Sequence, residues 1–509
     1  MSRLQGAKRL VFKGFLTASL GVGLTACPAV GERAPKPTDP PGSASKLSWM
    51  AIQYTRVQPR DTVLRRIEEE TGVDLEIWWV PDEHKDGKID TALVTDFPTD
   101  VVTIVDLFNP VFRKAVREGK FWEIGPYLRE YPNLQKMNPL ILKNIEIEGK
   151  IYGIYRERDL SRQGVIYRRD WLERLGLTEP RSVDDLYRIM KAFTEQDPDR
   201  DGVRDTYGLA DRADLRFGAF KTLASYFGAP NEWGVRDGRL LPEFMFEPYR
   251  EAMRFMRRLY REGLVNPDFA LSSKSKQWDL FAQGKAGVYI GNLDDAVNLY
   301  HAALPYDPSV RIDMANRIAG PDGCCRVWSQ PGHNGMFVFP KSRIRTQERL
   351  RQVLAFFDRL ADPDIGNYLH YGIEGIHYRV VDGRVQEIEG TEERREAEVR
   401  PLLSLIGLDN RSLEPGGNPL KMKSEVLTAD NLRFLVPNPA ESLVSETWLE
   451  RRDELDGIIR DATFRFILGQ LDENGFDAAV SAWRNAGGDR VIEEINAAYR
   501  NALWRASSP

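Results

Sequence analysis

Acidic residues at alternate positions make the segment 197–205 (D-P-D-R-D-G-V-R-D) the best candidate for a metal site. Acids occupy its first, third, fifth and ninth positions, and Gly202 occupies the sixth, as in the first part of an EF-hand loop. Carboxylates on alternate residues of a tight loop can point to one centre, and Ca²⁺ takes about 6–8 oxygen ligands. We therefore predict a structural calcium ion. Its expected ligands are Asp197, Asp199, Asp201, the backbone carbonyl of Val203, Asp205 and Thr206.

The end of this loop departs from the EF-hand pattern. Its twelfth position is Gly208, where an EF-hand has a bidentate glutamate, so Thr206 or an acid elsewhere would have to complete the shell. The alternative interpretation is a solvated aspartate-rich turn without an ion. Against that alternative, carboxylates this close together repel one another strongly unless a cation lies between them.

Aromatic residues in loops are candidates for a carbohydrate site, because such sites combine flat apolar faces with polar groups around them. The chain has 11 Trp and 18 Tyr, and most of these rings must fill the core, so position along the chain has to select the candidates. Loops and the ends of elements are where side chains most often reach a ligand. The selected candidates are Tyr54, Trp233, Trp278, Asp295, Trp328, Tyr371, Glu374 and His377. For each of them the alternative is a structural place in the core.

Alternating strand and helix patterns must position these residues. Residues 47–54 read as a strand, 62–70 as a helix stopped by Gly72, and 73–79 as a half-buried strand. This alternation predicts an α/β fold with parallel strands. Amphipathic helices are expected at 183–193, 248–262 and 346–360, and the C-terminal part, 446–503, is expected to be nearly all helical.

The N-terminus has the pattern of an export signal. Positive residues at Arg3, Lys8 and Arg9 precede a mostly apolar or small segment that ends in Leu24-Thr25-Ala26-Cys27. This ending resembles the lipobox of bacterial lipoproteins, in which the signal is cut before the cysteine and the cysteine is lipidated. The alternative is a buried N-terminal helix with an incidental cysteine. A proline-rich stretch then follows, so we predict a signal peptide over 1–26 and a lipidated Cys27 with a tether over 27–46.

Composition excludes several classes of protein. With 42% hydrophobic and 29% charged residues the chain is neither disordered nor collagen-like. A net charge of -5 without a basic block makes nucleic acid an unexpected partner. The three cysteines provide no disulfide framework, and the adjacent pair Cys324-Cys325 could form a strained ring disulfide or stay as two free thiols.

Five segments resemble the family 1 extracellular solute-binding proteins, which are lipoprotein receptors of bacterial ABC importers for oligosaccharides. They occur in the expected order over nearly all of the mature chain. These segments are 148–154 (E-G-K-I-Y-G-I), 166–172 (I-Y-R-R-D-W-L), 281–291 (F-A-Q-G-K-A-G-V-Y-I-G), 371–382 (Y-G-I-E-G-I-H-Y-R-V-V-D) and 487–492 (G-G-D-R-V-I). The chain is also similar to calcium-containing alginate-oligosaccharide-binding members, whose loop has an acid at its tenth position, where this chain has Thr206.

The resemblance implies an α/β fold of the type II periplasmic-binding-protein kind, with two lobes, a hinge crossed three times and a helical C-terminus. The crossings are expected near Arg158, Arg326 and Gly375. A ligand in the cleft would hold the lobes together by hinge closure. The first lobe would then comprise 47–158 and 326–375, and the second lobe 159–325 and 376–509.

The implied function is binding. We expect a monomeric receptor, lipid-anchored on the extracellular face of the cell membrane, that passes an oligosaccharide to the permease subunits of an ABC importer. Arg156, Arg158 and Arg326 could suit an acidic saccharide. One alternative is a surface glycoside hydrolase or lyase, because a hydrolase needs only two suitably spaced carboxylates. Another is a calcium-dependent adhesin or sensor lipoprotein. The chain has no H-E-x-x-H, P-loop, G-x-S-x-G or C-x-x-C motif that would favour an enzyme.

Overall fold

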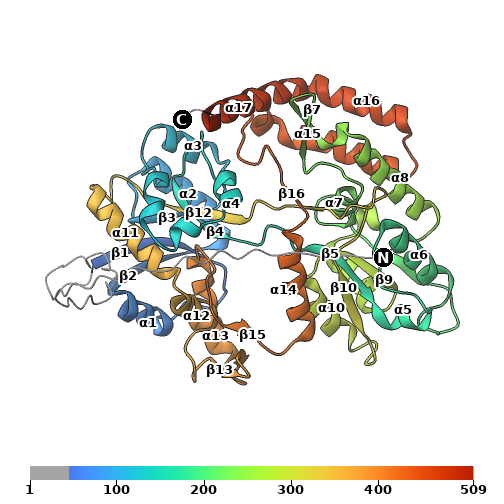
Figure 1. The fold of residues 1–509 in the computed structure, drawn as a ribbon, viewed down its shortest axis with the longest axis horizontal. Helices are drawn as coiled ribbons and strands as arrows, with labels where there is room; N and C mark the ends of the chain where they lie inside the picture. Colours follow the sequence, from blue (N-terminus) through green and yellow to red (C-terminus); the bar gives the residue numbers. More distant parts are fainter. Residues whose placement is uncertain (1–44, 508–509) are drawn as a thin grey trace, which may run out of the picture. The chain divides into compact units, whose positions relative to one another are not determined.

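The computed structural model describes residues 45–507, with side chains as far as Trp504, and the predicted signal segment and Cys27 lie outside the described residues. Buried apolar side chains form two large separate cores. The first core draws on residues 47–160 and 336–408, and the second on 165–318 and 440–495. These cores define a first and a second lobe, which lie on the left and on the right in Figure 1. Within residues 45–507 no helix has the length and apolar character needed to span a bilayer.

A five-stranded mixed sheet forms the centre of the first lobe, in the order β2-β1-β3-β12-β4. Strands β1, β2 and β3 are parallel, and β12 runs antiparallel to β3 and β4. The ring of Trp49 on β1 packs against Phe337 and Phe357 at centroid distances of 4.7 and 5.0 Å, which joins a helix to the sheet. The strands are β1 (Ser45–Gln53), β2 (Val73–Pro81), β3 (Val101–Ile104), β4 (Gly153–Glu157) and β12 (His333–Val338). The helices are α1 (Thr62–Thr71), α2 (Lys85–Val94), α3 (Pro110–Arg117), α4 (Pro139–Asn144), α11 (Gln347–Leu360) and α12 (Pro363–Tyr371).

A four-stranded sheet in the order β10-β5-β9-β6 forms the centre of the second lobe. Strands β6 and β9 are parallel, and β5 is antiparallel to β9 and β10. Helix α8 buries Tyr249, Met253 and Met256 on one face, as its helical spacing predicts. The strands are β5 (Gln163–Arg168), β6 (Tyr207–Ala210), β9 (Ala286–Asn292) and β10 (Ile312–Ala315), with a hairpin of β7 (Trp233–Arg236) and β8 (Arg239–Pro242). The helices are α5 (Arg169–Arg174), α6 (Val183–Glu195), α7 (Ala219–Tyr226), α8 (Glu247–Arg261), α9 (Lys274–Ala282) and α10 (Asp295–Ala303).

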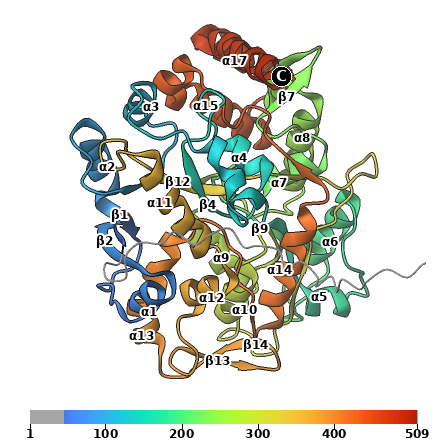
Figure 2. The ribbon, with the colours of Figure 1, turned by 60° about the vertical axis from the view of Figure 1, so that its left-hand side comes forward.

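The C-terminal part is helical, as predicted, and packs on the second lobe. Helices α15 and α17 lie at the same end as α8 and β7 in Figure 2. Two buried hydrogen bonds fix them there: Tyr249 and Thr463 join their hydroxyls at 3.0 Å, and Asn496 Nδ2 donates to the Leu240 carbonyl at 2.8 Å. The helices are α14 (Pro419–Asn431), α15 (Glu446–Ile467), α16 (Glu473–Trp483) and α17 (Asp489–Ser507).

One lobe boundary differs from the prediction, which placed all of 376–509 in the second lobe. Val399, Leu402 and Leu405 are buried in the first core, because the chain stays in the first lobe for more than thirty residues after Gly375. This stretch also forms α13 (Glu392–Glu398) and a small sheet of β13 (Tyr378–Val381), β14 (Arg384–Glu387) and β15 (Glu414–Pro415). The third crossing therefore lies between Leu408 and α14 and not near Gly375.

The chain segments that cross between the lobes hydrogen-bond to one another. The first joins β4 to β5, and the second joins β11 (Val327–Trp328) to β12. Arg158 N donates to the Gly332 carbonyl at 2.9 Å, and Gln330 N donates to the Leu160 carbonyl at 2.6 Å. Strand β11 also pairs with β16 (Leu435–Val436). A hinge built of paired extended segments can bend while each lobe keeps its own core.

Candidate functional site

The edge of the second-lobe sheet where β6 and β9 end is the strongest candidate site. Because β6 and β9 are parallel and β5 is antiparallel to β9, Ala210, Asn292 and Gln163 lie at this one edge. In open α/β sheets, ligands bind outside the carboxyl ends of the strands. A cavity of about 390 Å³ opens here. It is lined by Arg212, Ala213, Asp214, Phe217, Ser272, Ser273, Lys274 and Asn292; we call it the Phe217 cavity.

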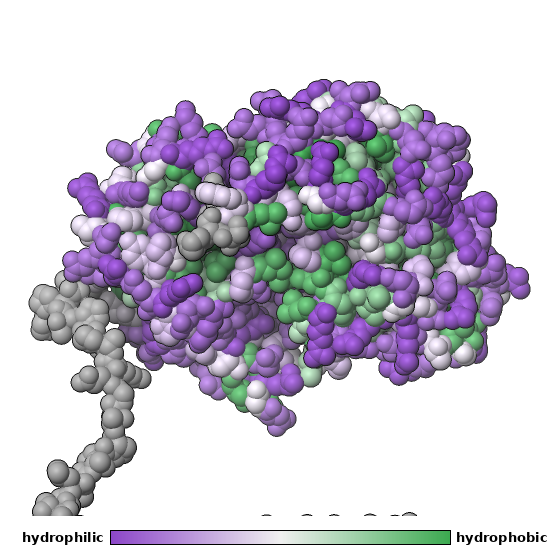
Figure 3. Space-filling view, turned by 45° about the horizontal axis from the view of Figure 1, so that its top comes forward, coloured by the Kyte–Doolittle hydropathy of each residue, from purple (hydrophilic) through white to green (hydrophobic). Residues whose placement is uncertain are grey.

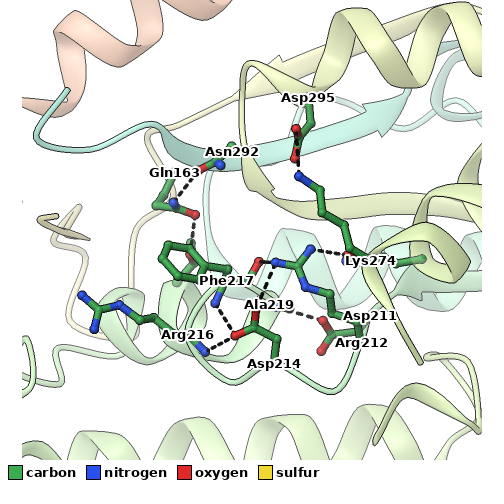
Figure 4. Close-up of polar contacts among 12 residues, drawn as sticks. Gln163, Asp211, Arg212, Asp214, Arg216, Phe217, Ala219, Lys274, Asn292 and Asp295 are labelled. Atoms are coloured by element: carbon green, nitrogen blue, oxygen red, sulfur yellow. Dashed lines mark hydrogen bonds and ion pairs between the residues drawn. The ribbon is translucent and has the colours of Figure 1, made fainter. Parts of the chain in front are cut away.

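The loop after β6 presents the ring of Phe217 to this cavity (Figure 4). Asp214 Oδ1 accepts hydrogen bonds from Arg216 N at 3.0 Å and from Phe217 N at 2.9 Å, which fixes the turn. The Phe217 side chain is 40% exposed and rests against the ring of Trp328 at a centroid distance of 5.9 Å. Polar residues cover most of the face in Figure 3, and apolar residues gather near its middle. An exposed aromatic ring with charged neighbours is the kind of platform on which a sugar ring stacks.

Asp211 holds the start of α7 beside the cavity. Its Oδ1 accepts from Ala219 N at 2.9 Å, and the side chain is buried. Burial raises the pKa of Asp211 to about 7, although backbone hydrogen bonds from Ala219 and Arg212 act in the opposite direction. Below about pH 7 the folded protein therefore keeps this acid protonated.

We expect Asp211→Asn to change how stability depends on pH. In the unfolded chain the pKa of an aspartate is about 3.9, so ionisation of Asp211 lowers the folding stability progressively as the pH rises from about 4 to about 7. Asparagine keeps the oxygen that accepts from Ala219 and cannot ionise. Across this range, the melting temperature of the variant should increase relative to that of the wild type as the pH rises. Parallel curves would contradict this account of Asp211.

Two of the predicted residues, Trp278 and Asp295, lie next to the cavity. Lys274 Nζ is 3.4 Å from Asp295 Oδ1 and 4.9 Å from the centre of the Trp278 ring. Asp295 Oδ2 accepts from the Tyr289 hydroxyl at 2.6 Å, and burial together with this carboxylate raises the pKa of Tyr289. Asp295 therefore holds neighbouring side chains in place, and its predicted part in ligand binding stays a prediction.

Trp328 does not offer a face to a ligand in this structure, in contrast to the prediction. The side chain is 0% exposed, and its Nε1 donates to Thr222 Oγ1 at 3.0 Å. The exposed ring of Phe217 covers it.

Trp233 lies at the start of β7 and borders a second cavity of about 450 Å³, together with Trp448 and Trp483. The two cavities share Ala213 and Asp214, so they adjoin each other.

Tyr371, Glu374 and His377 lie in the first lobe, outside both cavities. His377 is buried, accepts from Ile373 N at 3.0 Å and contacts Glu398 at 3.1 Å, and burial lowers its pKa. Tyr371 donates to the Leu413 carbonyl at 3.0 Å. These residues were selected because the third crossing was expected at Gly375, and the structure has this crossing after Leu408.

The first lobe contributes Tyr54, which follows β1 and is 46% exposed. The guanidinium of the buried Arg156 lies 5.6 Å from the centre of this ring and donates to the Tyr54 hydroxyl at 3.3 Å. Phe108, after β3, meets Trp448 of α15 at a centroid distance of 6.5 Å. This contact joins the two lobes directly.

A larger cavity of about 780 Å³ lies beside the crossings, between α4 and α14. Among the described residues no aromatic ring lines it, and several of its charged groups are paired with each other, such as Arg411 with Asp409 and Lys421 with Glu425. We therefore place the sugar site at the Phe217 cavity, where an aromatic ring is exposed.

The aspartate-rich loop brings three carboxylates together. Single oxygens of Asp197, Asp199 and Asp201 lie within 4.8 Å of one another. Asp197, Arg200 and Gly202 have φ angles of 49°, 62° and 87°, which turn the chain tightly around this point. Burial raises the pKa of Asp199, and Asp197 and Asp201 raise it further. The Oδ1 atoms of Asp197 and Asp199 are buried without a hydrogen-bond partner among the described residues. This donor set suits a hard divalent cation such as Ca²⁺.

The other predicted metal ligands are arranged differently. Asp205 forms an ion pair with Lys285, and the Thr206 hydroxyl donates to the Phe193 carbonyl at 2.6 Å. Thr206 is therefore held away from the carboxylates by a buried hydrogen bond. The backbone amide of Val203 donates to Asp201 Oδ1 at 2.8 Å, and its side chain is exposed.

Three residues that line the cavity, Phe217, Lys274 and Asn292, were not among the predicted ones. Asn292 ends β9 and Phe217 lies in the loop after β6, which was a usable signal because strand ends on one edge meet in space. Arg156, which the sequence suggested for an acidic saccharide, supports Tyr54. Cys324 and Cys325 have free thiols in this structure, one exposed and one half-buried.

Comparison with known proteins identifies the class to which this architecture belongs. The family model described as "Bacterial extracellular solute-binding protein" matches residues 60–321, and the chain belongs to this family. A solved structure of a solute-binding protein associated with a human-milk-oligosaccharide ABC transporter, from Bifidobacterium longum infantis, has the same fold. The TM-score between the two structures is 0.70 and the sequence identity is 15%. The superposition covers 90% of this chain and 99% of that chain. The predicted family and the two-lobed α/β fold are confirmed.

Two relatives cover almost the whole chain. The polygalacturonan/rhamnogalacturonan-binding protein YtcQ of Bacillus subtilis is 45% identical over 498 residues, which is 98% of this chain and 100% of the relative. Lipoprotein LipO of the same organism is 35% identical over 471 residues, 91% of this chain and 93% of the relative. The first relative is thus named as a binding protein and the second as a lipoprotein. This chain is a solute receptor of the extracellular solute-binding family.

Proposed function

We propose that this protein captures an oligosaccharide derived from a pectin-type polysaccharide and delivers it to an ABC importer. The exposed Phe217 ring, set among hydrogen-bonding groups at the ligand-binding edge of the second-lobe sheet, is the observation that carries the proposal. The name of the relative YtcQ supports this ligand class. The ABC-transporter association of the solved solute-binding protein supports an importer as the general kind of partner.

The geometry suggests how the two lobes would share the ligand. Phe217 would support one sugar ring from the second lobe, and Tyr54 would face the ligand from the first lobe. The paired segments at the hinge allow the lobes to rotate, so a ligand that touches both lobes stabilises the closed form. We expect binding without turnover. Incubation with pectic oligosaccharides tests this directly, because the release of shorter products would favour the surface hydrolase or lyase.

We further propose that calcium binds at Asp197, Asp199 and Asp201 and has a structural role. The support is the convergence of three carboxylates, two of which have an oxygen buried without a hydrogen-bond partner among the described residues. Bound calcium would supply positive charge between these carboxylates and hold the connection between α6 and β6 in place.

Anchoring through a lipid on Cys27 remains part of the proposal, supported by the lipobox-like ending and by the relative named LipO. We expect Cys27→Ala to move the protein from the membrane fraction to the medium, or to block its processing, because a lipid chain attached there would no longer hold it. Fractionation of cells followed by intact-mass analysis measures both effects. A membrane fraction as rich in the variant as in the wild type would contradict lipidation at this residue.

A further inference from the structure

We propose that the Phe217 cavity is a subsite for a uronate sugar, in which Lys274 and the side-chain amide of Asn292 bind the carboxylate while the sugar ring lies on Phe217. This inference rests on the proposed function and adds the residues that select the charge of the ligand. Two observations support it. The cavity presents hydrogen-bond donors from Lys274 and Asn292, and a chain of buried hydrogen bonds holds the Asn292 side chain.

A chain of hydrogen bonds that starts at Trp328 determines which way the amide of Asn292 points. An indole N–H can only donate, so Thr222 Oγ1 must accept from Trp328 Nε1, at 3.0 Å. The Thr222 hydroxyl then has its own proton for Gln163 Oε1, at 3.3 Å. Gln163 Nε2 in turn donates to Asn292 Oδ1 at 2.7 Å. In this structure the hydrogen bonds therefore run in one direction, from Trp328 to Asn292.

The end of this chain faces the cavity (Figure 4). Asn292 Oδ1 accepts from Gln163 Nε2, and the Nδ2 of the same side chain offers N–H donors to a ligand. Trp328, Thr222 and Gln163 are all buried, so water does not compete for these bonds. The buried indole thus makes Asn292 a fixed donor towards the cavity.

Among the described residues, the charged side chains that line the cavity are Arg212, Asp214 and Lys274. Arg212 is buried and already donates to Gln277 Oε1 at 2.8 Å and to the Phe217 carbonyl, and its ion pair with Asp214 is 3.3 Å long. Asp214 also accepts from two backbone amides of its own loop. Arg212 is therefore held by its buried neighbours, and Asp214 fixes the turn of its own loop.

Lys274 is the available cation. Its side chain is 49% exposed, and its Nζ is 3.4 Å from Asp295 Oδ1, longer than the roughly 2.7–2.9 Å of a strong charge-assisted hydrogen bond. Asp295 has a stronger partner in the Tyr289 hydroxyl, at 2.6 Å. An ammonium group has three donors, so Lys274 can keep this loose contact and still bind an incoming carboxylate. Because Lys274 and Asn292 both donate hydrogen bonds into the cavity, the cavity favours a ligand group that is anionic over one that is itself a hydrogen-bond donor.

The test compares trigalacturonate with its fully methyl-esterified form, which has the same sugar stereochemistry and no charge. Titration calorimetry on the mature protein should show Lys274→Met weakening the binding of the acid by about tenfold or more, because a charge-assisted hydrogen bond is lost. Binding of the ester should change much less. Lys276→Met is the matched control, since Lys276 is an exposed lysine on the same helix that does not line the cavity, and it should bind both ligands like the wild type.

Two further variants test the hydrogen-bond chain. Asn292→Asp replaces the donor with a carboxylate, so it should reduce binding of the acid more than binding of the ester. Trp328→Phe removes the indole N–H and keeps a ring beneath Phe217, so it should reduce the preference for the acid while the melting temperature confirms that the protein is folded.

The outcomes separate this inference from the proposed function. Equal losses for acid and ester in Lys274→Met, or no loss in either, would overturn the uronate subsite. If the wild type binds a neutral oligosaccharide in a Phe217-dependent way and ignores trigalacturonate, the receptor function stands and the subsite is wrong. If the wild type binds no oligosaccharide of either kind, the proposed function itself fails.

Discussion

Replacing Phe217 with alanine is expected to weaken oligosaccharide binding by about 1–3 kcal/mol, or roughly 5- to 150-fold, by analogy with the loss of other ring-stacking platforms. The ring is exposed at the cavity and is held in place by the Asp214 turn below it. Because the side chain is already partly in water, its removal should affect the fold far less than the loss of a buried ring. Calorimetric titration of both proteins with pectic oligosaccharides measures the effect.

Tyr306→Ala provides the control for this prediction. Tyr306 is an exposed aromatic residue of the same lobe that lines none of the cavities described above. Its replacement should leave the affinity unchanged. If Phe217→Ala binds as tightly as the wild type, or if both variants lose affinity equally, then the sugar does not stack on Phe217.

Removal of calcium is expected to lower the melting temperature, with magnesium restoring it less well than calcium. The carboxylates of Asp197, Asp199 and Asp201 repel one another when no ion is bound, and a ligand at about 100 times its dissociation constant stabilises the folded state by about 2.7 kcal/mol. Magnesium should be weaker because it loses its water reluctantly and demands a stricter geometry. Differential scanning calorimetry with chelator, calcium or magnesium distinguishes these cases.

The structure also supplies a matched pair of variants for the calcium loop. Asp199→Asn should abolish the response to calcium, whereas Asp205→Asn should keep it, because Asp205 is ion-paired with Lys285 and is not one of the three converging carboxylates. Both changes remove one negative charge from the same loop. A chelator without effect on the metal-free wild type would show that the loop is only a solvated turn. Loss of sugar binding in a folded Asp199→Asn protein would place the metal in the ligand site.

The sequence was sufficient to predict the elements that depend on local pattern. Helix α1 begins and ends close to the predicted 62–70 because Val63, Leu64 and Ile67 have helical spacing and Gly72 takes a φ of 70°. The aspartate spacing likewise brought Asp197, Asp199 and Asp201 together, since a tight loop forces alternate side chains to one side. The contacts of Asp205 and Thr206 could not be predicted in this way, because their partners Lys285 and Phe193 come from other elements.

Features that depend on tertiary packing could not be predicted from the sequence patterns. Trp328 and Phe217 are both plausible ring platforms, and only their stacking decides that Phe217 is exposed and Trp328 is buried. The third crossing was expected too early because the apolar residues Val399 to Leu408 could have entered either core. The hydrogen-bond chain from Trp328 to Asn292 joins four elements, so no local spacing indicates it.

Calorimetric titration of the wild-type protein with trigalacturonate and with neutral pectic oligosaccharides is the direct test of receptor function. A receptor should bind one oligosaccharide per protein molecule, saturably, and the ligand should be recovered unchanged afterwards. Heat that does not saturate with any of these oligosaccharides, or a ligand recovered as shorter fragments, would contradict the claim that this protein is an oligosaccharide receptor.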